Sequence, residues 1–277
     1  MTLHFNSFSI LASMKQNLNN KVVWITGASS GIGEALALAL AKEGAQLVLT
    51  ARNEKKLLAL KAQCDNYSQG SMVLALDLFQ IDTFPAAVEK VIAQFGRIDV
   101  LINNAGISQR ALTREADLEI DRKVMELNFF SPVALTKAVL PYMLKQKSGH
   151  IAITSSIVGK FGFPLRSAYS SSKHAVIGFF DSLRAEEDDI DVTIIIPGRV
   201  QSNISVNAIG KDGKAEGRMD PGQQNGMPAE KSAQIIVKAL KKKRKEILVG
   251  RKELLMVHIR RFLPRLYYKL AKKVSAR

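Results

Sequence analysis

A tyrosine and a lysine four positions apart, with a serine ahead of them, are the side chains of this sequence best suited to acid–base chemistry. On a helix, Tyr169 and Lys173 would share one face. A nearby ammonium favours the phenolate, so we expect Lys173 to lower the pKa of Tyr169 from about 10, as proton exchange near neutral pH requires. Ser156 follows an apolar run and is placed to hydrogen-bond a substrate oxygen. Without the other motifs, this pair would be better explained as a buried tyrosine and an exposed lysine on an amphipathic helix than as an acid–base pair.

A glycine-rich turn near the start of the chain is typical of a phosphate-binding loop. It follows the apolar run Val22–Thr26 and precedes a helical pattern. Glycines let the backbone approach a pyrophosphate, and the N-terminus of a helix offers unpaired N–H groups and the positive end of its dipole. The predicted cofactor contacts in this turn are Gly27, Ser29, Ser30, Gly31, Ile32 and Gly33.

The end of the next apolar run indicates which dinucleotide binds. Where NAD enzymes carry an acidic residue for the ribose hydroxyls, this sequence has Ala51, followed by Arg52. No carboxylate would repel a 2′-phosphate there, and a guanidinium pairs with one, so NADP(H) is the predicted cofactor. Arg52 also fits a solvated residue at a helix start, and the glycine turn adds no second basic residue.

Two further run ends fit a bound dinucleotide. Asp77 closes the third run and is placed to accept a hydrogen bond from the adenine amino group. The string Asn-Asn-Ala-Gly closes the fourth run with small residues, where the cofactor would cross a sheet. The predicted contacts in this string are Asn104, Ala105 and Gly106.

Together these motifs resemble the single-domain short-chain dehydrogenase/reductases, from about residue 21 to residue 250. The resemblance implies four catalytic residues: Asn128, Ser156, Tyr169 and Lys173. In it, Asn128 holds a helix irregularity and a water that links Lys173 to solvent. It also implies that a Pro-Gly segment borders the nicotinamide through Pro197, Gly198, Val200 and Ser202, with Ser202 in place of the usual threonine.

The resemblance implies an oxidoreductase that interconverts a carbonyl and a secondary or primary alcohol. NADPH would deliver hydride to the carbonyl carbon while Tyr169 protonates the oxygen. In this scheme Lys173 lowers the pKa of the tyrosine and, like Tyr169, contacts the cofactor, because it holds the nicotinamide ribose. Ser156 polarises the carbonyl.

The segment between the serine and the tyrosine should border the substrate, together with Ser156 and Tyr169 themselves. Its aromatic residues, Phe161 and Phe163, suggest an apolar ligand, although they would equally pack under a lid. A closer likeness to the hydroxysteroid-dehydrogenase-like and retinol-reductase-like branch implies a steroid-, retinoid- or lipid-like substrate.

These residues must be brought together by a fold that places the ends of the apolar runs side by side, and the sequence pattern predicts such a fold. Short β-branched runs alternate with amphipathic stretches, as in a parallel sheet with crossover helices. The expected strands are Val22–Thr26, Gln46–Ala51, Met72–Asp77, Asp99–Ile102, Gly149–Ser155, Val192–Pro197 and Glu246–Val249, and the expected helices lie near 32–43, 54–63, 83–95, 117–127, 131–146 and 167–186. We therefore predict one α/β domain over residues 21–250, after a lead-in at 1–20. It is a doubly wound parallel sheet of Rossmann type in three α/β/α layers.

Composition limits the other classes of function. With Cys64 as the single cysteine, no intrachain disulfide can form, and no metal site is expected. No uncharged stretch is long enough for a transmembrane helix, and the N-terminus is a poor signal peptide. We expect a cytoplasmic protein, with a peripheral place on a membrane as an alternative. Residues 201–228 hold five glycines after a strand end, which favours a substrate lid over a disordered loop.

The positive charge gathers at the C-terminus. From Lys241 to Arg277 there are 14 Lys/Arg and 2 Asp/Glu, a net charge of +12, against 26 and 23, a net of +3, in the preceding 240 residues. The basic amphipathic tail at 251–277, in which Pro264 should break any helix, suits an anionic membrane surface. It equally suits a cover over the substrate pocket or an oligomer contact. Nucleic acid is the least favoured partner because no reading motif accompanies the charge.

One expectation about assembly and two alternative functions remain. The apolar residues Val176, Phe179, Phe180 and Leu183 on the helix of Tyr169 suggest a homodimer or homotetramer, as the resemblance also implies. A non-catalytic NADP(H)-binding sensor would need no intact set of four catalytic residues. A membrane-tethered protein would owe its role to the tail.

Overall fold

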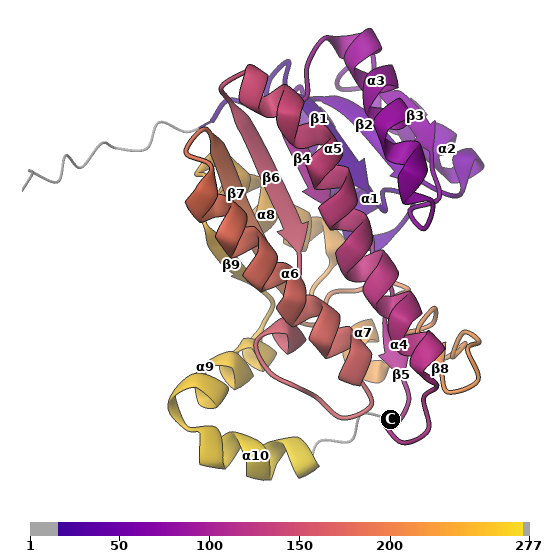
Figure 1. Cartoon of the computed structure of the whole chain (residues 1–277), viewed down its shortest axis with the longest axis vertical. Helices are drawn as coiled ribbons and strands as arrows, with labels where there is room; N and C mark the ends of the chain where they lie inside the picture. Colours follow the sequence, from indigo (N-terminus) through magenta and orange to yellow (C-terminus); the bar gives the residue numbers. More distant parts are fainter. Residues whose placement is uncertain (1–15, 274–277) are drawn as a thin grey trace, which may run out of the picture.

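Seven apolar runs form one parallel sheet in the order β3-β2-β1-β4-β6-β7-β9. The computed structural model describes residues 16–273 (Figure 1). The strands are β1 Val22–Thr26, β2 Gln46–Ala51, β3 Met72–Ala75, β4 Val100–Asn103, β6 Gly149–Thr154, β7 Ile190–Pro197 and β9 Glu246–Val249. The strand order reverses between β1 and β4, so the predicted doubly wound topology is confirmed.

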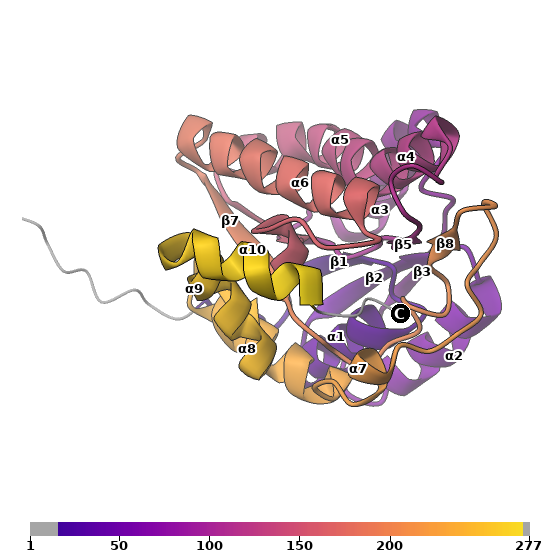
Figure 2. The same cartoon turned by 90° about the horizontal axis from the view of Figure 1, so that it is seen from below.

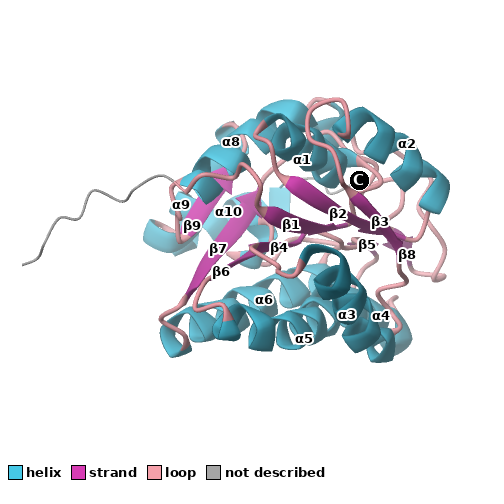
Figure 3. Ribbon diagram, turned by 90° about the horizontal axis from the view of Figure 1, so that it is seen from above, coloured by secondary structure: helices cyan, strands magenta, loops and turns pink. Residues whose placement is uncertain are grey.

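Helices cover both faces of this sheet (Figure 3). On one face lie α1 Gly31–Lys42, α2 Glu54–Cys64 and α8 Ala229–Lys241, and on the other lie α3 Phe84–Phe95, α5 Ser131–Lys145 and α6 Ser167–Glu186. Successive side chains of β1 alternate between the two layers, as strand geometry requires. Val23 and Ile25 pack in the core under α1, whereas Val22 and Trp24 pack in the core under α3 and α6. The continuous apolar runs therefore reflect burial on both faces.

The remaining elements are short. They are η1 Ile81–Thr83, β5 Gln109–Arg110, α4 Leu118–Met125, the π-helical η2 Glu126–Phe130, η3 Ile157–Gly159, β8 Ile209–Gly210, α7 Pro221–Gln224, η4 Lys252–Leu254, α9 Leu255–Phe262 and α10 Pro264–Lys273. Several of them lie beyond the carboxyl ends of the strands: α4, β5, β8, α7, α9 and α10 (Figures 1 and 2). The break between α9 and α10 falls at Leu263, directly before Pro264, as a proline requires.

The observed elements differ from the expected ones mainly at their ends. The third strand stops at Ala75 rather than at Asp77. Strand β7 begins at Ile190, two residues before the expected start at Val192. The helix expected at 117–127 is α4 followed by the π-helical η2. Helix α8 and the small β5–β8 sheet were not expected. Of the predicted lead-in and tail, residues 1–15 and 274–277 lie outside the described residues.

A buried carboxylate at the head of β4 joins three neighbouring segments. Asp99 Oδ2 accepts a hydrogen bond from the Val22 N–H at 3.0 Å, and Oδ1 pairs with Lys21 Nζ at 2.9 Å. Arg97 donates to both oxygens, at 2.9 and 2.5 Å. Burial raises the pKa of Asp99, but the hydrogen bonds from Arg97, Val22 and Lys21 outweigh burial and hold the pKa below its usual value.

We expect Asp99→Asn to lower the free energy of unfolding at neutral pH by about 1.5–3 kcal/mol, because it replaces charge-assisted hydrogen bonds by neutral ones. The folded-state pKa of Asp99 is depressed, so its contribution is present above the unfolded pKa of about 3.9 and is lost as the pH falls through the folded pKa. Urea unfolding of both proteins between neutral and acid pH should show the difference shrink.

The exposed pair Glu119–Arg122 provides the control, because the Glu119 side chain is 77% exposed. Glu119→Gln should change stability by less than about 0.5 kcal/mol at every pH. A constant difference for Asp99→Asn across the acid range would contradict the assigned role of its charge.

Candidate functional site

The glycine turn between β1 and α1 is shaped by close backbone contacts. Gly27 has a φ of +67°, which L side chains rarely adopt. A Cβ on Gly33 would lie 2.2 Å from the Gly27 carbonyl oxygen and 2.7 Å from Asn104 Nδ2. The Ser30 side chain, at the N-cap of α1, makes no capping hydrogen bond within the described residues. The first N–H groups of α1 are thus left for a phosphate.

The ends of β1 and β4 are fixed side by side by one threonine. Thr26 Oγ1 accepts hydrogen bonds from the Asn104 N–H at 3.0 Å and the Ala105 N–H at 3.1 Å. The Asn104 side chain donates to the Thr26 carbonyl at 3.2 Å. The predicted contact Asn104 therefore also buttresses the glycine turn.

The two predicted adenosine contacts lie at neighbouring strand ends. Arg52 follows β2, is exposed, and forms no ion pair with any residue in the described range 16–273. Asp77 lies two residues beyond β3, is half-buried, and accepts a hydrogen bond from the Phe79 N–H at 3.1 Å. One of its oxygens is thus used to form a turn.

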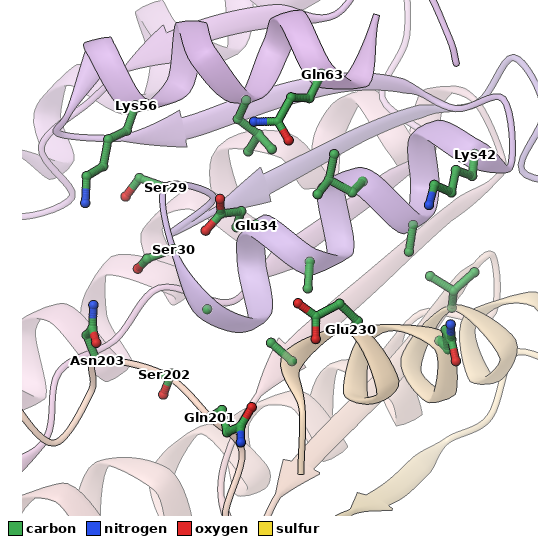
Figure 4. A pocket seen from close by; sticks show the side chains of 18 of the residues that line it. Ser29, Ser30, Glu34, Lys42, Lys56, Gln63, Gln201, Ser202, Asn203 and Glu230 are labelled. Atoms are coloured by element: carbon green, nitrogen blue, oxygen red, sulfur yellow. The ribbon is translucent and has the colours of Figure 1, made fainter. Parts of the chain in front are cut away.

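The Pro-Gly segment after β7 brings Ser202 to the glycine turn. A Cβ on Gly31 would lie 2.9 Å from Ser202 Cβ, and Gln223 Nε2 donates to Ser202 Oγ at 3.1 Å. A hollow of about 1400 Å³ opens here and is lined by Ser29, Ser30, Gly31 and Ser202 among others (Figure 4). It continues along the outer side of α1 between α2 and α8, and its lining includes neither Arg52 nor Tyr169.

These features fit a dinucleotide. A left-handed glycine, a glycine without room for a Cβ and an uncapped helix N-terminus provide the cradle that a pyrophosphate needs. The hollow beside them accounts for the pyrophosphate end only, because it does not reach Tyr169. The segment at 201–228 packs against the turn through Ser202, whose hydroxyl accepts a hydrogen bond from Gln223 of the same segment.

The predicted acid–base pair lies on the buried face of α6. Tyr169 and Lys173 are 9% and 3% exposed, and Lys173 Nζ lies 5.8 Å from the centre of the Tyr169 ring. Ser156 caps η3 two residues after the end of β6, and a hydrogen bond from its hydroxyl is among the causes that lower the pKa of the Tyr169 phenol. Ser156, Tyr169 and Lys173 are thus brought together as the sequence predicts.

The direction of the tyrosine pKa differs from the expectation. Burial raises the pKa of Tyr169, and Arg166 and the Ser156 hydrogen bond lower it only in part. Lys173 is not the cation that offsets the burial, because its own burial lowers the pKa of its ammonium to about 8. The Lys173 ammonium donates to the Thr154 carbonyl at 2.8 Å. In the protein alone, Arg166 has the role that we expected of Lys173.

The predicted Asn128 lies in the π-helical η2 and is 1% exposed. Its side-chain oxygen accepts from the Ile107 N–H at 2.9 Å, and its Nδ2 donates to the Ile107 carbonyl at 2.9 Å and to Ser172 Oγ at 3.0 Å. The expected helix irregularity is therefore present. A Cβ on Gly106 would lie 3.0 Å from Asn128 Oδ1 and 3.3 Å from Lys173 Nζ, so the small-residue string adjoins both.

A group of charged residues beside Tyr169 was not found from the sequence. Arg166, three residues before Tyr169, contacts Ser108 Oγ and lies 3.8 Å from Asp220 Oδ2. Arg110 donates to the same Asp220 oxygen at 2.6 Å. Burial lowers the pKa of the Arg166 guanidinium to about 10. Asp220 belongs to the segment 201–228, which is thereby tied to the start of α6. The one signal in the sequence for this charged group is the position of Arg166, about one helical turn before Tyr169.

The two predicted substrate phenylalanines lie in the same apolar cluster as Tyr169. Phe161 is 3% exposed, and its ring centre lies 5.4 Å from that of Tyr267 on α10. Phe163 is half-buried. Phe161 thus packs against the C-terminal helix α10. The cluster also includes Ile204 and Ile209 of the segment 201–228, and Phe163 keeps the larger free surface.

The chain is similar to known proteins over most of its length. The family model for short chain dehydrogenase matches residues 21–212. A mouse protein named dehydrogenase/reductase SDR family member 7B is 44% identical over 275 residues, which cover 96% of this chain and 85% of the mouse protein. A Drosophila melanogaster protein named dehydrogenase/reductase SDR family protein 7-like is 40% identical over 264 residues, 92% and 80% of the two chains.

Solved structures share the fold. A short chain dehydrogenase/reductase from Burkholderia phymatum in complex with NAD superimposes with a TM-score of 0.78 at 24% identity, over 91% of this chain and 96% of the other. An alcohol dehydrogenase from Thermococcus sibiricus complexed with 5-hydroxy-NADP gives a TM-score of 0.72 at 26% identity, over 84% and 97%.

Proposed function

This chain belongs to the short-chain dehydrogenase/reductase family and is an oxidoreductase acting on CH–OH groups; we propose that its cofactor is NADP(H) and its substrate an apolar carbonyl or alcohol. The observation that carries the reaction is the meeting of Tyr169, Lys173, Ser156 and Asn128 at the carboxyl edge of the sheet. These four side chains come from η2, the start of η3 and α6.

In the proposed reaction the bound nicotinamide supplies or accepts the hydride. The Tyr169 phenol gives its proton to the substrate oxygen, or takes one from it in the reverse direction. Ser156 hydrogen-bonds that oxygen beside the phenol. Hydrogen-bond donors aimed at the developing charge stabilise the transition state. Burial keeps the phenol protonated near neutral pH, which suits the direction of carbonyl reduction.

Lys173 and Asn128 hold the pair in place. The Lys173 ammonium is fixed by the Thr154 carbonyl, 2.8 Å away, which leaves its other N–H groups for a ribose and for the phenol. Asn128 binds both the N–H and the carbonyl of Ile107 and also Ser172, which in turn donates to the Tyr169 carbonyl at 2.8 Å. These bonds connect η2, the small-residue string and α6.

NADP(H) is preferred over NAD(H) because of the end of β2. Arg52 is exposed there and has no ion-pair partner in the described range, and Ala51 stands where a carboxylate would otherwise take the ribose hydroxyls. The proposed further contacts are those predicted at Asp77, Asn104 and Ser202.

The apolar cluster around Tyr169 supports an apolar substrate. It contains Phe161 and Phe163 together with residues of α9 and α10. A steroid-, retinoid- or other lipid-like carbonyl would meet mainly aromatic and aliphatic side chains there. We also propose that the segment 201–228, held by Asp220 through Arg110 and Arg166, acts as the substrate lid.

A homo-oligomer and a cytoplasmic location, with peripheral contact to a membrane, complete the proposal. Val176, Phe180 and Leu183 are buried in the core of the chain itself, so they are not available to contact a second copy. The surface left for a second copy is aromatic instead, with Phe130, 48% exposed, stacked edge-on against Phe129, which also contacts Phe179.

A screen of carbonyl compounds with NADPH and with NADH, following loss of reduced-cofactor absorbance, tests the function. We expect turnover with NADPH, and Arg52→Ala should lower kcat/KM for NADPH by about 10–100-fold through KM, with little change for NADH. Lys55→Ala removes a neighbouring exposed cation of α2 and is the matched control. Equal losses with both cofactors would refute the role of Arg52, and NADPH binding without any turnover would favour the sensor.

A further inference from the structure

The exposed apolar side chains of this protein are concentrated on its last two helices. Ten large hydrophobic residues are exposed in the described part of the chain, and five of them lie between Leu255 and Tyr268. We call these five the tail surface: Leu255, Phe262, Leu263, Leu266 and Tyr268, which are 59%, 68%, 55%, 43% and 54% exposed. Such a concentration marks an interaction surface.

The tail surface is most exposed at the corner between α9 and α10. All six residues from Arg261 to Leu266 are exposed, and three of them are large and apolar. In Figures 1 and 2 the two helices stand out from the body at the carboxyl edge of the sheet. The corner therefore projects from the molecule rather than filling a gap in it.

The charges around this surface are of one sign. Between Leu255 and Lys273 there is no aspartate or glutamate, and there are six cations. They are Arg260, Arg261, Arg265, Lys269, Lys272 and Lys273. Apolar side chains beside cations match an anionic lipid surface, because the apolar groups enter the acyl boundary while the cations meet lipid phosphates.

The opposite side of the same helices already has a structural role. Tyr267 is 3% exposed, packs on Phe161 and donates its hydroxyl to the Gly162 carbonyl. Met256, Val257, Ile259 and Ala271 pack with it in the cluster that contains Tyr169. The inner side thus covers the substrate segment, and the tail surface is not needed to hold the helices in place. The sequence left open whether the tail covers the substrate pocket or contacts a membrane. In the structure these two roles would use different sides of the same two helices.

We infer that the tail surface docks the protein on an anionic membrane, with Phe262, Leu263 and Leu266 entering the lipid and Arg261 and Arg265 pairing with its phosphates. Within residues 16–273, no helix is both long and apolar enough to cross a bilayer, so this contact is peripheral. Docking also places the segment from Ser156 to Tyr169 near the lipid, with α10 between them, because α10 rests on Phe161 and Gly162. If the proposed apolar substrate is correct, it enters from the membrane.

A small hollow beside the surface is suited to a lipid headgroup. It measures about 390 Å³ and lies between α10 and the segment at Gly162 and Pro164. Arg260 and Lys272 line it, and the Arg260 guanidinium is held over the Tyr268 ring at 5.3 Å. A phosphate placed there would meet two cations on an aromatic floor.

Flotation of the full chain with vesicles tests the inference independently of any enzymatic turnover. We expect binding to phosphatidylcholine vesicles that contain phosphatidylserine, weakened by added salt, and little binding to phosphatidylcholine alone. The triple variant Phe262→Ser/Leu263→Ser/Leu266→Ser should lose at least about tenfold in partitioning. Arg261→Gln/Arg265→Gln should lose about fivefold for each charge, with the apolar side chains intact.

The matched control is Leu58→Ser/Tyr67→Ser, which removes side chains that are 53% and 56% exposed and lie in or just after α2. It should float like the wild type. The circular-dichroism spectrum and the unfolding temperature establish that each variant is folded, and the charge variant keeps the test valid if the triple variant is not.

Unchanged flotation of the folded triple and charge variants would overturn the inference, as would equal binding to neutral vesicles. If the wild type sediments as a dimer without lipid and the triple variant as a monomer, and neither floats, the surface joins two copies of the chain instead. Binding to a DNA duplex without binding to vesicles would likewise overturn it. None of these results bears on the oxidoreductase reaction, which the carbonyl screen tests.

Discussion

Tyr169→Phe is expected to lower kcat by about 10²–10⁴-fold, the range that a positioned general acid contributes, with NADPH affinity changed by less than about threefold. Phenylalanine keeps the ring that packs with Phe161 and Ala168 in the apolar cluster, so the fold of the site should persist. Only the hydroxyl beside Ser156 is lost. The measurements are steady-state turnover with a carbonyl found in the screen, and NADPH binding by fluorescence.

A matched variant separates this effect from the mere loss of a tyrosine hydroxyl. Tyr142 is half-buried near the end of α5 and packs against a core cluster that does not include Tyr169, and Tyr142→Phe should leave kcat within about twofold of the wild type. If Tyr169→Phe turned over like Tyr142→Phe, Tyr169 would not be the proton donor, and the proposed mechanism would fall with it.

The sequence was sufficient to predict the sheet because its strands are buried on both faces and read as unbroken apolar runs. The errors lie where polar side chains compete with the strand. Asp77 was placed in the third strand, but its carboxylate accepts from the Phe79 N–H and turns the chain after Ala75. Helix α8 was missed although Ala233, Ile236, Val237 and Leu240 have helical spacing, a signal that its position after the glycine-rich segment obscured.

The proposed catalytic residues Tyr169 and Lys173 could be named from their spacing on one helix and Ser156 from its place after a strand, whereas Asn128 rested on the family resemblance. The charges around them could not be predicted, since they depend on long-range contacts. Arg110 and Asp220 are 110 residues apart and meet only when β5 pairs with β8. The sequence likewise suggested Lys173 as the cation that lowers the pKa of Tyr169. Burial, which weakens the Lys173 charge and raises the tyrosine pKa, cannot be assessed from spacing alone.

Gly33→Ala is expected to weaken cofactor binding by at least about tenfold and to lower the free energy of unfolding by about 1–3 kcal/mol, as overpacking does. The added Cβ would lie 2.2 Å from the Gly27 carbonyl oxygen, which is backbone and cannot swing away. Helix α1 would have to move away from the turn, and its uncapped N–H groups would move with it. NADPH titration and urea unfolding measure the two effects.

Gly178 makes the comparison decisive because it too lies within a helix, α6, and nothing approaches its Cβ position within 4 Å. Alanine is the better helix former, so Gly178→Ala should raise stability by about 0.5–1 kcal/mol and leave NADPH binding unchanged. The same intrinsic gain is available to Gly33→Ala, so an opposite sign at Gly33 isolates the cost of contact with Gly27 and Asn104. If both substitutions stabilised the fold and left cofactor affinity intact, the close approach of α1 to the turn could not be what shapes the phosphate cradle.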